Sequence, residues 1–126
     1  MDAKLLETPG AELSHKVIGA FYRTYNELGH GFLESVYQNA LVLELRAEGI
    51  ECRQQIPIEV RFRNSVVGLF RADVIVQDQL IIEIKAVQNL QPAHESQLIN
   101  YLKATGIRLG LLLNFGPKAQ VRRRVF

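Results

Sequence analysis

Three charged residues stand in two stretches whose composition is otherwise typical of buried β-strands. Asp73 interrupts the largely apolar run of residues 70–76, and Glu83 and Lys85 interrupt the run of residues 80–87. Charged side chains are rarely buried unless they are paired or bind a metal. Because Glu83 and Lys85 are two residues apart, they lie on one face of an extended strand. These three residues are therefore the first candidates for chemistry.

The length of the loop between the two strands decides whether the two carboxylates meet. A two-residue loop would place Asp73 opposite Ile84 and mix charged with apolar side chains on both faces. A three-residue loop at residues 77–79 places Asp73 opposite Glu83 and makes one face wholly apolar. A one-residue slip turns every side chain to the other face, so the pattern selects the three-residue loop. In that register Val76 pairs with Leu80, Val74 with Ile82 and Ala72 with Ile84.

Two opposed carboxylates repel one another, so another charge must offset the repulsion. One solution is a hard divalent cation, Mg²⁺ above all, bound by the oxygens of Asp73 and Glu83. The other is a surface ion-pair cluster in which Arg71 and Lys85 balance the two acids. The residue pattern alone leaves both solutions open.

Two predicted helices carry further polar groups. Glu34 lies in the first turn of a helix predicted over residues 33–48, where an acidic side chain also stabilises the helix dipole. Gln97 and Tyr101 are four residues apart in a helix predicted to begin at Pro92, so they share one helix face. Taken singly, Glu34 is explained by its stabilisation of the helix dipole. Tyr101 is likewise typical of an aromatic residue at the boundary of the core, with its hydroxyl group in water.

The hydrophobic periodicity predicts the elements that must position these residues. Apolar residues recur at helical spacing before Gly49 and alternate with polar residues after Ile50. The order favours an α/β fold, in which hairpin strands and a helical crossover build a mixed central β-sheet flanked by helices. The predicted elements are helices 12–28, 33–48 and 92–105, strands 50–62, 66–76, 80–87 and 109–115, and an edge strand 121–126.

Composition limits the classes of protein that the chain can form. A length of 126 residues predicts one domain, residues 1–126, with a core large enough to need no disulfide or metal for folding. The single cysteine excludes an intrachain disulfide, a Cys-rich zinc site and a four-Cys iron–sulfur cluster. The first seven residues lack the basic-then-apolar order of a signal peptide, and no apolar run is long enough to span a bilayer. We therefore expect a cytoplasmic protein without membrane contact.

The net charge of +2 hides a local basic surplus. Four of the 15 basic residues lie in the last nine positions, and without them 11 basic residues face 13 acidic ones. Such a segment fits a surface that faces phosphates. It also fits an edge strand that its charges protect from pairing with other chains. The four residues are Lys118, Arg122, Arg123 and Arg124.

Taken together, these residues resemble the PD-(D/E)XK nuclease superfamily and, more closely, its GxxExxY branch. The residues that carry the resemblance are Gly31, Glu34 and Tyr37, Asp73 with Glu83-Ile84-Lys85, and Gln97 with Tyr101. Ala72 departs from the proline of the superfamily's name. The resemblance implies a restriction-endonuclease-like core, αβββαβ, over residues 31–115. The N-terminal helix 12–28 would precede this core, and the basic segment 118–126 would follow it.

The resemblance also implies metal-dependent hydrolysis of phosphodiester bonds, with Mg²⁺ or Mn²⁺ as cofactor. Asp73, Glu83 and the backbone carbonyl of Ile84 would bind the metal, and Glu34 would reach it directly or through water. The metal would polarise the phosphate and lower the pKa of a bound water. Lys85 would orient that water or stabilise charge on the phosphate. The candidate catalytic residues are therefore Glu34, Asp73, Glu83, Lys85 and Gln97.

Nucleic acid is the implied partner, and we favour DNA. Candidate nucleic-acid-binding residues are Tyr101, Arg61, Arg63, Lys118, Arg122, Arg123 and Arg124. The basic residues among them are expected to contact the phosphate backbone irrespective of sequence. So short a chain has little room for a separate target-recognition domain, so a homodimer or a partner protein is expected. The alternative is a non-catalytic nucleic-acid-binding or interaction module that retains the nuclease fold.

Overall fold

A computed structural model describes residues 10–126 of the chain. The residues on which the expected absence of a signal peptide rests lie outside this range. The described elements are α2 (Ala11–Leu28), α3 (Glu34–Ala47), β1 (Cys52–Phe62), β2 (Ser65–Val76), β3 (Leu80–Lys85), α4 (Pro92–Thr105), β4 (Leu109–Phe115) and β5 (Ala119–Val125). Helices 12–28 and 33–48 were therefore predicted to within one residue at each end. Strand β3 ends two residues earlier than expected, and the edge strand begins two residues earlier.

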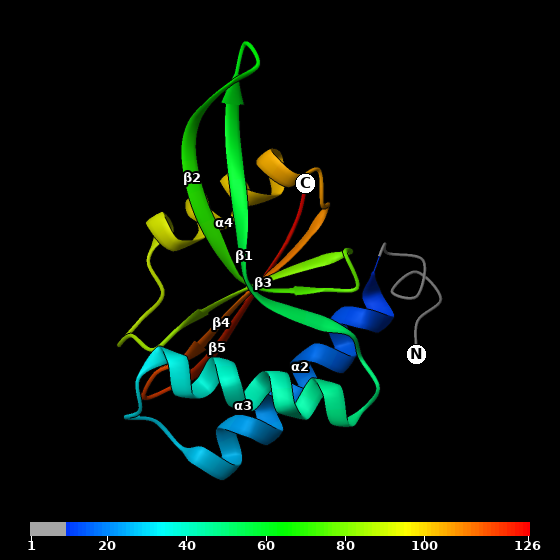
Figure 1. The fold of residues 1–126 in the computed structure, drawn as a ribbon. Coiled ribbons are helices and arrows are strands. Elements are labelled where there is room, and N and C mark those ends of the chain that lie inside the picture. The colour runs from blue at the N-terminus through cyan, green and yellow to red at the C-terminus, as the bar shows by residue number, and fades with distance from the viewer. Residues whose placement is uncertain (1–9) are drawn as a thin grey trace.

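The strands form one mixed sheet with helices on both faces (Figure 1). The strand order is β1-β2-β3-β4-β5, in which β3 and β4 are parallel and all other neighbours are antiparallel. Helices α2 and α3 cover one face, and α4, which connects β3 to β4, covers the other. This confirms the mixed α/β fold expected from the order of the elements. Within the described residues, none of these helices is long and apolar enough to cross a membrane.

The core has two layers because the centre of the sheet is covered on both faces. Val74, Ile82 and Leu111 pack beneath α2 and α3. Ile81 and Leu112 pack beneath α4. Strand β4 is buried at every position, as its continuous apolar sequence predicted.

Helix α4 lies close to the sheet because Gly110 has no side chain. A Cβ atom at Gly110 would come within 2.8 Å of the Leu98 side chain. This close approach sets the height of α4 above β3 and β4, and so the position of the polar residues that α4 carries.

The hairpin of β1 and β2 extends beyond the rest of the sheet, alongside α4 (Figure 1). Its register shifts between Val60 and Arg61, which is typical of a β-bulge that increases strand twist. The outer part of the hairpin leaves large apolar side chains exposed, namely Phe62, Val66, Val67, Leu69 and Phe70.

Candidate metal centre and substrate groove

Strands β2 and β3 pair in the predicted register for only three residue pairs. The three-residue turn at 77–79 places Val76 opposite Leu80, and the pairing continues to Val74 and Ile82. The expected pair of Ala72 with Ile84 does not form. Ala72 instead packs in the cluster beneath α4, so the alternation of β2 changes between this residue and Val74. The strands therefore separate immediately after Val74 and Ile82.

Asp73 lies at the point where the two strands separate. Its carboxylate accepts a hydrogen bond of 2.7 Å from the backbone N–H of Ile84. The backbone N–H of Asp73 in turn bonds to the Glu83 carboxyl group. Side chains thus replace the backbone ladder at this point, and the two acids become neighbours across the strands. Ile75 and Ile81 lie on the same face as the two acids, beneath α4.

Glu83 is the buried member of the pair, with 4% of its surface exposed. Burial is the largest of the causes that together raise the pKa of Glu83 to about 10. The hydrogen bond to Asp73 and that residue's negative charge act in the same direction, and Lys85 opposes them. Its Oε1 atom is buried without a hydrogen-bond partner among residues 10–126. A buried carboxyl oxygen without a partner is rare and calls for an explanation.

The oxygens around Glu83 suit a hard divalent cation. Asp73 and Glu83 offer carboxylate oxygens, and the Ile84 carbonyl lies beside them in the chain. A cation would pair with the unpartnered oxygen and offset the repulsion between the acids. The described residues contain no group of three His, Cys, Asp or Glu side chains arranged to hold a metal. A metal here would therefore rest on two carboxylates, with backbone carbonyl and water oxygens completing its shell.

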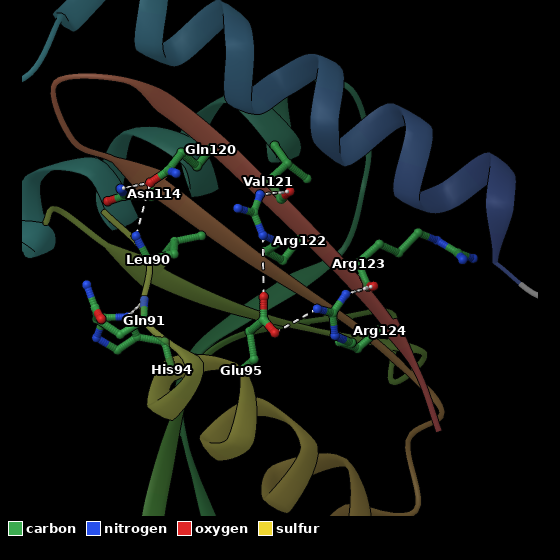
Figure 2. Close-up of polar contacts among 10 residues, drawn as sticks. All are labelled: Leu90, Gln91, His94, Glu95, Asn114, Gln120, Val121, Arg122, Arg123 and Arg124. Atoms are coloured by element: carbon green, nitrogen blue, oxygen red, sulfur yellow. Dashed lines mark hydrogen bonds and ion pairs between the residues drawn. The ribbon is translucent and has the colours of Figure 1, made fainter. Parts of the chain in front are cut away.

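Lys85 is half-buried at the end of β3, and its ammonium group lowers the pKa of Glu83. The loop that follows Lys85 is held by Asn114 of β4, which bonds both backbone groups of Val87 at 2.9 Å. Gln120 of β5 accepts hydrogen bonds from Asn114 and from the Leu90 N–H (Figure 2). Asn114 was not identified from the sequence. Its signal is an amide side chain in an otherwise apolar strand.

Helix α4 brings Gln97 and Tyr101 toward the carboxylates. The Gln97 amide donates a hydrogen bond of 2.8 Å to the Tyr101 hydroxyl. Burial, the charge of Glu83 and, more weakly, that of Asp73 raise the pKa of Tyr101. The tyrosine therefore lies within electrostatic reach of both acids. Its ring also contacts Phe70 of β2, with ring centroids 5.8 Å apart, and the residue pattern did not predict this neighbour.

Glu34 is exposed in the first turn of α3, and the structure does not bring it into the carboxylate pair. The loop before it is fixed by Tyr37, whose hydroxyl donates to the Gly29 carbonyl and accepts from the Phe32 N–H. Gly31 adopts a φ of 114°, which favours glycine. The spacing of Gly31, Glu34 and Tyr37 thus has a local structural reason, which is the entry of the chain into α3.

One turn after Glu34, α3 reaches the strand next to Asp73. Gln38 accepts a hydrogen bond of 2.9 Å from the Gln55 side chain. Gln55 lies between the Gln54–Val74 and Ile56–Ala72 pairs of the β1–β2 ladder and has a φ of 52°. The first half of α3 therefore faces the same end of the sheet as the carboxylate pair.

The basic residues of the C-terminal segment do not form a single surface (Figure 2). Arg122 and Arg124 form ion pairs with Glu95 of α4, at 3.3 and 2.7 Å. Arg123 points to the opposite face, where it bonds to Ser14 of α2 at 3.3 Å. The alternation of a β-strand separates them in this way. The segment forms the edge strand β5, as one of its two interpretations from the sequence expected, and its contact with phosphates stays a prediction.

The remaining basic candidates are exposed. Arg61 pairs with Glu59 at 2.6 Å on the β1–β2 hairpin. Arg63, at the tip of the same hairpin, lies 5.0 Å from the centroid of the Phe62 ring. Lys118 lies in the turn between β4 and β5.

A groove of about 1030 Å³ separates the β1–β2 hairpin from α4. Gln97 and Tyr101 are part of its wall, and Tyr101 is the wall residue on which the charges of Glu83 and Asp73 act. We call it the hairpin groove. The residues that line it are Glu59, Val60, Arg61, Phe70, Ala93, His94, Ser96, Gln97, Asn100, Tyr101, Lys103 and Ala104.

Comparison with known proteins agrees with this fold. The family model of the PD-(D/E)XK nuclease superfamily matches residues 11–125, so the chain belongs to that superfamily. The crystal structure of SSO0001 aligns with 92% of this chain at a TM-score of 0.55 and 19% identity. This likeness shows a shared restriction-endonuclease-like fold, and the chain spans 59% of the length of that protein. No curated protein matches the sequence significantly.

Proposed function

We propose that this protein is a metal-dependent nuclease that hydrolyses phosphodiester bonds, with DNA as the favoured substrate. The observation that carries the proposal is the buried Glu83 carboxyl group, which has an unpartnered oxygen and lies beside Asp73 and Lys85. Membership of a nuclease superfamily supports it independently. Within that superfamily we propose membership of the GxxExxY branch, which is supported by the spacing of Gly31, Glu34 and Tyr37 and by the way in which Gly31 and Tyr37 shape the entry into α3.

Mg²⁺ or Mn²⁺ is the proposed cofactor, and Asp73, Glu83 and the Ile84 carbonyl would hold it. When bound, the metal supplies Lewis-acid activation of the phosphate and of water. The protein must first release the proton that Glu83 retains in the absence of metal, because the pKa of this group is about 10. Once Glu83 is ionised, the two negative charges of Asp73 and Glu83 would face the positive charges of Lys85 and of the metal.

The other site residues act on the water and the phosphate. Lys85 would stabilise the negative charge that develops on the phosphate, since its ammonium group already acts on Glu83. Gln97 uses one N–H to bond Tyr101, so a second N–H and its carbonyl oxygen can orient water or a phosphate oxygen. Glu34, exposed at the start of α3, would act through a water molecule.

A nuclease assay with matched variants tests this proposal. Wild-type protein should cleave DNA with Mg²⁺ or Mn²⁺ and should be inactive in chelator. Asp73→Ala and Lys85→Ala should each reduce cleavage by at least 100-fold. Asp78→Ala and Lys16→Ala are the controls, because both residues are exposed outside the site. Cleavage that survives Asp73→Ala, or that continues in chelator, would overturn the proposal.

The second candidate is a nucleic-acid-binding module that retains the fold without catalysis. It is favoured by one observation, that no third His, Cys, Asp or Glu side chain joins Asp73 and Glu83 in the described part of the chain. This candidate requires salt-dependent binding of nucleic acid with no cleavage in either metal. The same assay, run with a binding measurement at two salt concentrations, distinguishes the two functions.

A further inference from the structure

The hairpin groove contains an aromatic ring that the fold leaves half exposed. Phe70 projects from β2 into the groove with 46% of its surface exposed, although its ring contacts that of Tyr101. Tyr101 itself is buried and lies within electrostatic reach of Glu83. An exposed aromatic face is therefore fixed one side chain away from the proposed catalytic centre. Such a face is a stacking surface for another planar group.

The polar residues around Phe70 suit a nucleotide. Asn100, Ser96 and Gln97 of α4 provide hydrogen-bond donors and acceptors along one wall. Lys103 adds a positive charge to the same helix. On the hairpin wall, Arg61 is partly neutralised by its ion pair with Glu59. An aromatic stacking surface beside amides and cations is the usual means by which proteins bind unpaired bases.

The position of the aromatic ring favours single strands over duplexes. In a duplex the base faces are covered by their neighbours, and a ring at the base of a groove can reach a base only after it has left the stack. At about 1030 Å³, the groove is at the upper end of the range for small-molecule sites. It therefore has room for one or two nucleotides whose backbone continues past Gln97 toward the carboxylates.

We propose that the hairpin groove binds an unpaired nucleotide, whose base stacks on Phe70, and that the substrate is single-stranded nucleic acid or the unpaired part of a branched one. This inference rests on the proposed nuclease function and names its substrate class. We assign no residue of the groove to the distinction between DNA and RNA. The test therefore includes a single strand of each.

The absence of tryptophan from the chain allows a direct test of stacking. Phe70→Trp introduces a single tryptophan into the groove, and a base that stacks on it quenches its fluorescence. Leu69→Trp is the matched control, because Leu69 is the next residue of β2, is exposed and lies on the other face of the strand. Both proteins are titrated in chelator with oligo-dT, with oligo-U and with a DNA duplex, so that neither catalysis nor metal enters the measurement.

We expect saturable quenching of Phe70→Trp by a single strand and at least tenfold weaker binding of the duplex. The control Leu69→Trp should show little quenching. Phe70→Leu retains the apolar contact with Tyr101 and lacks the stacking surface, and it should weaken single-strand binding, measured by anisotropy, about tenfold. The relative affinities of oligo-dT and oligo-U identify the strand that the groove prefers.

Equal quenching by the duplex, or no quenching at all, would overturn the inference, as would unchanged affinity in Phe70→Leu. These outcomes are separable from failure of the nuclease proposal. Duplex cleavage without quenching of Phe70→Trp would leave the nuclease standing and remove the groove's role. Quenching without any metal-dependent cleavage would support the groove's role in binding and overturn the nuclease proposal.

Discussion

Glu83 couples the candidate metal centre to the stability of the protein. Its pKa of about 10 in the folded state compares with 4.5 as the ordinary value. Between these pH values the folded state binds more protons than the unfolded state, so the free energy of unfolding falls as the pH rises. The stabilising effect of the proton is complete below pH 4.5 and is lost as the pH approaches 10. A metal that replaces this proton should restore stability at neutral and higher pH.

Glu83→Gln should therefore stabilise the metal-free protein at pH 8 by about 2 kcal/mol, because ionisation of Glu83 favours the unfolded wild type at this pH and the amide cannot ionise. The difference should shrink toward pH 5, where the unfolded wild type begins to retain the proton as well. Added Mg²⁺ should stabilise the wild type and leave the variant unchanged. Urea unfolding followed by circular dichroism measures each effect. Equal stability of both proteins across pH 5–8 would contradict the buried, protonated carboxyl group.

At the scale of elements, the end of β3 is fixed by β4 rather than by its own hairpin. β3 separates from β2 after Ile82 but stays paired with β4 as far as Lys85 and Asn114. Gly116, which follows β4, allows the chain to run close to the backbone of Val87. A Cβ atom at this position would lie 1.9 Å from the Val87 carbonyl oxygen. The separation on one side and the pairing on the other create the opening in which the carboxylates lie.

Asn114→Ala should destabilise the protein by about 3 kcal/mol, because it leaves both backbone groups of Val87 without partners. Cleavage should also fall under conditions in which the variant is fully folded, because the loop after Lys85 loses its attachment. Asn89→Ala in the same loop is the control, since Asn89 is exposed. Thermal unfolding and single-turnover cleavage separate the two effects. A folded Asn114→Ala protein with normal cleavage would show that this attachment does not position Lys85.

At the scale of the whole molecule, two arginines of the edge strand β5 are held against α4. Arg122 lies in the same row of the sheet as Glu83, with Leu112 between them, which corresponds to roughly 10 Å at two strand spacings. Its ion pair with Glu95, which Arg124 shares, fastens the edge strand to α4 (Figure 2). Glu95 thereby occupies the two guanidinium groups that would otherwise be free to contact phosphates.

Glu95→Gln should release Arg122 and Arg124 and strengthen nucleic-acid binding at low salt. Two additional phosphate contacts would steepen the slope of log K against log salt by about 1.5. Fluorescence anisotropy over a range of salt concentrations measures this slope. Glu12→Gln, which breaks an exposed pair with Lys16 on α2, should leave it unchanged. An unaltered slope in Glu95→Gln would assign these arginines a purely structural role.

The local pattern of the sequence was enough to predict the elements and the register at the turn of β2 and β3. Side chains alternate along a strand, so only the loop of residues 77–79 could bury the apolar partners of both strands together. The same rule separates Arg123 from Arg122 and Arg124, although the segment was treated as one basic patch. Asn114 and Tyr37 were harder to interpret, because their partners are backbone groups that no composition pattern marks.

The sequence by itself determined that Asp73 and Glu83 would be neighbours, because this follows from a period of two residues and one turn. Tertiary structure alone decided that β2 and β3 separate at Asp73 and that the Asp73 carboxylate accepts a hydrogen bond from the Ile84 N–H. It also decided that a groove lies between Phe70 and α4. These features depend on the twist of a long hairpin and on the distance between a helix and a sheet. Both arise from contacts between residues far apart in the chain, and local periodicity carries no information about them.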